Sequence, residues 1–65
     1  MVSVKYVLVG PYLLNERDRA ISLLEVNVNA AIVRLDVISI QHQLTPVVSD
    51  KEIKLIYSAQ IMYRE

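Results

Sequence analysis

Residues 52–64 read EIKLIYSAQIMYR, and this stretch decides the fold. Alternate positions of a strand point to the same side of its sheet. One side of this stretch is apolar throughout, and it consists of Ile53, Leu55, Tyr57, Ala59, Ile61 and Tyr63. The stretch contains neither Pro nor Gly, so no residue in it requires an edge position. We therefore predict a long strand from Glu52 to Arg64 that the rest of the chain covers or pairs with.

The other side of this strand is mixed in character. It carries charged residues at its ends and apolar residues between them, in the series Lys54, Ile56, Ser58, Gln60, Met62 and Arg64. A face that lies fully in water is usually more polar than this. We therefore expect the second face to be partly covered, for example by another subunit.

Composition indicates one small domain, residues 1–65, that assembles with itself. The chain is 54% apolar and has a mean hydropathy of +0.35, whereas a domain of this size buries only about 60% of its unfolded surface. No run approaches the roughly 18 apolar residues of a membrane span. The chain has no Cys, which excludes disulfides and thiolate metal sites and fits a reducing, cytoplasmic location. No cofactor or metal is predicted.

The charge pattern argues against nucleic acid as a partner. Seven basic and seven acidic residues give a net charge of zero, and their signs alternate along the chain. Binding to a phosphate backbone draws on clustered Lys and Arg. No such basic stripe is present.

The remaining elements are predicted in chain order. A first strand covers Met1–Val9 and is interrupted by Gly10-Pro11, a turn signal. A connector over 11–14 leads to Asn15 as the helix N-cap, and the helix covers about Glu16–Arg34. A second strand covers Val37–Leu44, and a long loop over Thr45–Lys51 leads to the last strand. The predicted fold is α+β, with the order β-α-β-β and one helix packed on a face of a three-stranded sheet.

The helix carries two apolar stripes on different sides. The first consists of Ile21, Leu24, Val28, Ala31, Ile32 and Leu35; the second consists of Leu23, Val26, Ala30 and Val33. Packing on one sheet requires only one stripe. The second stripe, left in water, would be an exposed apolar ridge, which small monomers rarely tolerate. We expect it to form the interface of a dimer or of a larger even-numbered assembly.

Candidate ligand or partner contacts are few. Three glutamines, Gln41, Gln43 and Gln60, are expected as an amide-rich patch on paired strands. The single histidine, His42, and Tyr57 are weak candidates for catalysis, because nothing around them in the sequence resembles a nucleophile with its base. Two arginines, Arg17 and Arg19, begin the helix, where its dipole disfavours cations, so a partner contact is one interpretation and a solvated face the other.

Three segments resemble a family of proteins: LEVNVNAAI in the helix, DVISIQHQL in the second strand and IYSAQIMYRE at the end. Over Ser22–Glu65 the chain resembles the short, uncharacterised sporulation-associated proteins of Firmicutes and their phages. The resemblance implies a bacterial or phage origin. The family has no established catalytic residues to transfer to this chain.

Three functions are therefore considered. The first is a non-enzymatic, self-associating interaction protein of a bacterium or phage. The second is a phage-encoded inhibitor that binds a host protein or a small signal ligand. The third is an enzyme with a site shared between subunits, and the lack of catalytic motifs argues against it.

Overall fold

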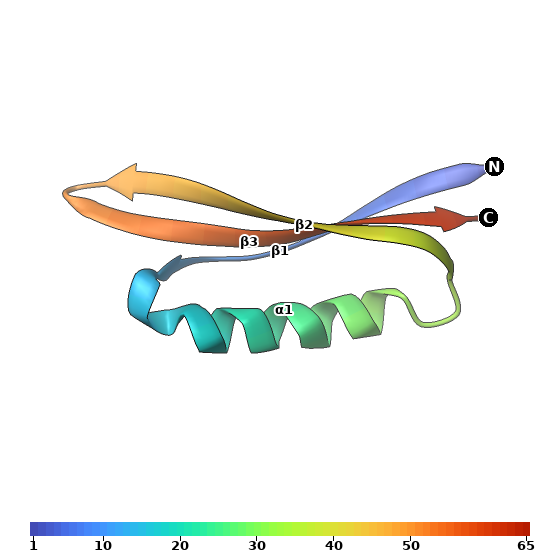
Figure 1. Ribbon diagram of the computed structural model, residues 1–65, viewed down its shortest axis with the longest axis horizontal. Coiled ribbons are helices and arrows are strands. Elements are labelled where there is room, and N and C mark those ends of the chain that lie inside the picture. Colours follow the sequence, from blue (N-terminus) through green and yellow to red (C-terminus); the bar gives the residue numbers. More distant parts are fainter.

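The computed structural model describes residues 1–65 and has the predicted element order. Strand β1 (Val2–Leu13) leads through a single 3₁₀ turn, η1 (Leu14–Glu16), into helix α1 (Arg17–Ala31). Strands β2 (Asp36–Ser49) and β3 (Glu52–Arg64) then complete the chain (Figure 1). The α+β prediction, a three-stranded sheet with one helix on a face, is confirmed.

The last strand is the centre of the sheet. The strand order is β1-β3-β2, and β3 is antiparallel to both neighbours. Its bounds, Glu52–Arg64, are those predicted from the alternation of apolar residues. The absence of Pro and Gly allows β3 to form hydrogen bonds along both sides, whereas β1 and β2 are both edge strands.

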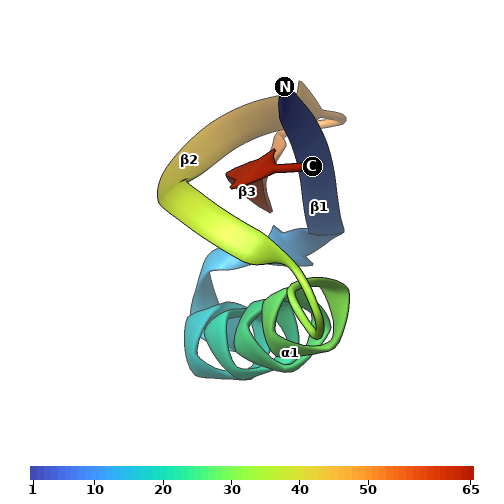
Figure 2. The same ribbon diagram turned by 90° about the vertical axis from the view of Figure 1, so that its right-hand side faces the viewer.

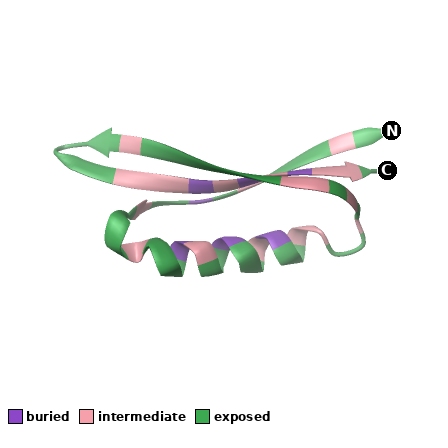
Figure 3. Ribbon diagram, viewed as in Figure 1, coloured by how far each residue is buried: buried purple, intermediate pink, exposed green.

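Helix α1 lies along one face of the sheet (Figure 2) and packs mainly against β1 and β3. The buried core lies in this layer and contains Val9, Ala20, Leu24, Val28, Tyr57, Ala59 and Ile61 (Figure 3). Ala20 and Ala59 have no exposed area, and their small size allows the helix to approach the sheet closely. The first predicted stripe is on this face, although it omitted Ala20. α1 has neither the length nor the continuous apolar character needed to cross a membrane.

The predicted end of the first strand is wrong. β1 does not stop at Gly10-Pro11 but continues to Leu13, with a bulge between Val9 and Tyr12. An edge strand tolerates Pro, because its missing N–H can face solvent. Gly10 makes the bulge feasible: its φ is +114°, and a Cβ there would lie 2.8 Å from the backbone oxygen of Leu55.

The predicted loop over Thr45–Lys51 is also wrong. β2 continues through Pro46, which pairs with Leu55, and ends at Ser49. Only Asp50 and Lys51 connect β2 to β3, with φ values of 46° and 69°. Positive φ at both central residues is the conformation of a type I′ turn, whose twist matches that of a hairpin.

The helix is shorter than predicted. Asn15 is not its N-cap, since it lies in η1, and the N–H of Leu13 instead donates to the Glu16 carboxylate at 3.0 Å. The helix ends at Ala31, not at Arg34. Arg34 has a φ of 68°, which is incompatible with a continuing right-handed helix.

Candidate functional site

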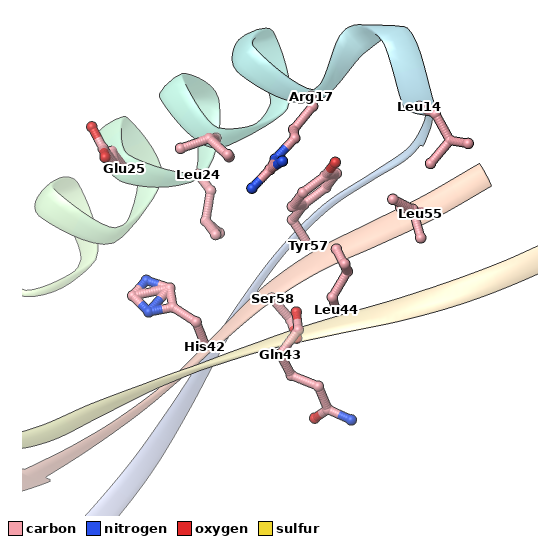
Figure 4. A pocket seen from close by; sticks show the side chains of 11 residues that line it. Leu14, Arg17, Leu24, Glu25, His42, Gln43, Leu44, Leu55, Tyr57 and Ser58 are labelled. Atoms are coloured by element: carbon pink, nitrogen blue, oxygen red, sulfur yellow. The ribbon is translucent and has the colours of Figure 1, made fainter.

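A pocket opens where α1 leaves β2 uncovered. Its volume is about 580 Å³, and it lies between one flank of the helix and the adjoining surfaces of β2 and β3 (Figure 4). The apolar lining comes from η1, α1, β2 and β3 and consists of Leu14, Ile21, Leu24, Leu44, Leu55 and the ring of Tyr57. This volume lies within the range of roughly 300–1,000 Å³ typical of small-molecule sites.

Six residues with polar side-chain groups also line this apolar space. They are Arg17 and Glu25 from α1, His42 and Gln43 from β2, and Tyr57 and Ser58 from β3. The ion pairs of the structure join Lys54 to Glu52 and Arg64 to Asp36, so the Arg17 guanidinium has no carboxylate partner. Figure 4 shows the Arg17 side chain extending from the helix toward the sheet, on the side where the Tyr57 ring rises from β3.

Tyr57 is the unusual member of this group. The residue is only 6% exposed, and its hydroxyl is buried without a hydrogen-bond partner. An unsatisfied buried donor costs about 1–3 kcal/mol, and buried Tyr hydroxyls usually find a partner. The ring packs in the core, whereas the hydroxyl forms no hydrogen bond there.

The predicted amide patch lies on the opposite, open face of the sheet. Gln41 and Tyr6 both pair with Gln60, which places the three side chains in one row across the sheet. Gln43 is in the next row, where the Ser58 hydroxyl donates to the Gln43 carbonyl at 3.3 Å. A hollow of about 160 Å³ lies among these residues. The structure thus brings the three glutamines together.

The patch and the pocket lie mainly on opposite faces of the sheet, but they share His42, Gln43 and Ser58. His42 points to the helix side, whereas the side chain of its neighbour Gln43 points away from it (Figure 4). Of the candidate contacts, Arg17 and Tyr57 line only the pocket, Gln41 and Gln60 line only the hollow of the open face, and His42 and Gln43 line both. Arg19 is exposed and lies at neither place.

The second helical stripe lies on the flank of α1 that faces away from the sheet. Leu23 is 39% exposed, Val26 62% and Val33 63%, and Ala30 is also exposed. Val33 lies in the turn after the helix rather than within it. These four residues, called the outer ridge below, make no contribution to the buried core.

Several pocket residues escaped prediction. Leu14 was assigned to a connector and Leu44 and Leu55 only to strands, and Glu25 was given no role. Periodicity shows which face a residue occupies but not how far a helix extends across the sheet. The sequence feature that could have indicated the pocket is the position of the cationic Arg17 between two apolar residues, Leu14 and Ile21.

The pocket lining includes one imidazole, His42, and one serine hydroxyl, Ser58. The Ser58 hydroxyl donates to the backbone carbonyl of Gln43. No three His, Asp or Glu side chains gather in a way that could hold a metal ion.

Comparison with protein-family models, with curated proteins and with solved structures finds no match to this chain.

Proposed function

We propose that the protein is a non-enzymatic, self-associating interaction protein of bacterial or phage origin that works in the cytoplasm as a two-fold dimer or a larger even-numbered assembly. The observation that carries this proposal is an excess of exposed surface. Only 7 of 65 residues are buried, while fourteen large apolar residues are exposed. A self-associating protein covers such surface with its own copies.

The area itself supports a dimer. The chain exposes 4912 Å², whereas a compact monomer of 7.4 kDa is expected to expose about 4,200 Å². The excess, about 700 Å², is close to the roughly 800 Å² that each partner contributes to a standard interface. One specific contact with a second copy would therefore return the chain to an ordinary exposed area.

The outer ridge is the surface that we assign to this contact. It is apolar, runs along a rigid helix, and is not used by the chain's own sheet. Two copies of one patch satisfy each other in a two-fold pair, and Ala30, at the middle of the ridge, would permit close approach of the helices. Each large aliphatic side chain contributes on the order of 1.5–3 kcal/mol when fully buried, before the cost of association. Side chains that are only partly covered contribute less free energy, so we expect the two copies to associate with micromolar affinity.

The test is to place charge on the ridge. The double variant Val26→Glu/Val33→Glu should remain folded, because both side chains are exposed, but should lose its assembly, because paired carboxylates would be desolvated against each other. Light scattering across a micromolar concentration series measures the mass. Circular dichroism of the same samples shows whether the fold is retained.

A matched variant places the same charge on the other exposed apolar surface. Val4 and Leu8 lie on the open face of β1 and are 44% and 66% exposed. Val4→Glu/Leu8→Glu should leave the assembly intact. If this variant dissociates and the ridge variant does not, the interface lies on the sheet and the ridge assignment is wrong; a wild-type mass of 7.4 kDa throughout removes self-association altogether.

The pocket favours one further candidate function, the binding of a small ligand. It offers an open apolar pocket together with an unpaired cation and an unused donor. The identity of that ligand class is argued next.

A further inference from the structure

We infer that the pocket between α1 and β2 binds an amphipathic monocarboxylate, an acid whose carboxylate meets Arg17 and Tyr57 and whose aliphatic or aromatic body fills the apolar lining. This inference does not depend on self-association, because the outer ridge lies on another flank of the helix. Its basis is that two polar groups without a partner, the Arg17 guanidinium and the Tyr57 hydroxyl, belong to residues that line one apolar cavity.

The head group follows from the two unused donors. Arg17 borders the pocket without an acidic partner, and guanidinium binds carboxylates in a planar, bidentate geometry. The Tyr57 hydroxyl belongs to a residue that is more than nine-tenths buried and has no partner of its own. A carboxylate has two oxygens and accepts from both groups. One anionic group would thus satisfy the cation and the orphan donor together.

The body of the ligand follows from the lining. Six residues of the wall are hydrophobic, and they come from η1, α1, β2 and β3. A volume of about 580 Å³ admits a medium-length fatty acid or an aromatic acid, and leaves no reason for a highly polar ligand such as a sugar. Apolar pockets with a few placed polar groups are the usual form of small-molecule sites.

The charges of the pocket set the orientation. Glu25 also borders it and would repel a carboxylate. Because eight residues separate Glu25 from Arg17, the two lie about 12 Å apart along the helix axis. His42 is on the Glu25 side of the pocket in Figure 4. The carboxylate therefore belongs at the Arg17 end, away from Glu25, and the apolar body lies against Leu24, Leu44 and Leu55.

The experiment compares three probes with one tail: decanoate, decanol and decyltrimethylammonium. Calorimetry measures affinity, and the methyl resonances of Leu24, Leu44 and Leu55 report the location. We expect saturable binding of one decanoate per chain with shifts at these methyls, and at least tenfold weaker binding of the neutral and cationic probes. Equal binding of all three, or shifts confined to Val26 and Val33, would show adsorption to exposed apolar surface and overturn the inference.

Two variants test the donors, each with a control. Arg17→Gln should weaken decanoate binding at least tenfold, whereas Arg19→Gln, the same change two residues away and outside the pocket, should leave it within twofold. Tyr57→Phe should weaken decanoate about three- to tenfold but leave decanol binding and the melting temperature unchanged or raised, because the hydroxyl has no partner in the protein. Equal effects of the two arginine variants would show that Arg17 acts only through nonspecific charge, which would contradict the proposed site.

Discussion

At the scale of single residues, the lone glycine has the most constrained position. Gly10 has a φ of +114°, a conformation that side chains rarely adopt, and its Cα faces the backbone oxygen of Leu55 across the sheet. Neither neighbour can move without breaking the pairing of β1 with β3. The bulge that lets β1 continue past Val9 therefore depends on the absence of a side chain at this position.

Gly10→Ala should lower the free energy of unfolding by roughly 1–3 kcal/mol, the usual cost of a strained backbone position. Urea denaturation followed by circular dichroism measures the loss. Lys5→Ala, at an exposed position of the same strand, should change stability by less than about 0.5 kcal/mol. Equal effects of the two substitutions would mean that the strand, not the glycine, is sensitive.

At the scale of the elements, the β2–β3 hairpin contains its own weak point. Both residues of its turn, Asp50 and Lys51, have positive φ. Asp tolerates the left-handed region, whereas Lys has no local side-chain interaction that favours it. The turn is tight because the twist of the two long strands requires it, and Lys51 carries the strain.

Lys51→Gly should therefore stabilise the protein by about 0.5–1 kcal/mol, because Gly reaches positive φ without steric cost and this gain exceeds its added freedom when unfolded. Thermal unfolding measures the change. Glu52→Gly, one residue later and within β3, should instead destabilise, since Gly weakens a strand interior. A lower melting temperature for Lys51→Gly would contradict the turn assignment.

The strands and the helix differ in how well the sequence predicts their ends. β3 was predicted with its correct bounds, because every second residue from Ile53 to Tyr63 is apolar and no Pro or Gly interrupts the stretch. The ends of α1 were not, because Asn15 lies in η1 and Arg34 has a positive φ. The ends of β1 and β2 were not, because Pro11 and Pro46 are turn signals whose meaning depends on whether the strand lies at an edge. That property belongs to the sheet order, which the chain does not encode locally. The pocket was half predicted for the same reason: Arg17, His42 and Tyr57 were named, but their convergence depends on where α1 crosses the sheet.

At the scale of the whole molecule, the shape is long and thin. Its extents are 44 × 19 × 12 Å, and its radius of gyration is 13.3 Å, compared with about 11 Å for a compact domain of this length. The hairpin turn at Asp50 and Lys51 extends past the start of α1 (Figure 1). Two thin layers bury little, and in the assembly proposed above a neighbouring copy would add to this burial.

The melting temperature of the wild type should consequently rise with protein concentration, because association stabilises only the folded state. Calorimetry over a hundredfold micromolar range measures this dependence. The ridge variant Val26→Glu/Val33→Glu should show a melting temperature that is lower and independent of concentration. A concentration-independent wild type would indicate a self-sufficient monomer.

The two prolines of the sheet limit the edge-to-edge stacking of copies of the chain. Pro46 pairs with Leu55, and Pro11 precedes Tyr12, which pairs with the same Leu55 from the other side. Both open edges are therefore interrupted at one level of the sheet, where each lacks a backbone donor. The bulge of β1, between Val9 and Tyr12, coincides with Pro11, whereas β2 has a second irregularity between Val37 and Ser39. A stack of copies joined edge to edge, as in a fibril, would meet these interruptions at every step, which is a known protection of edge strands. The chain can thus expose apolar faces while its sheet edges resist edge-to-edge polymerisation.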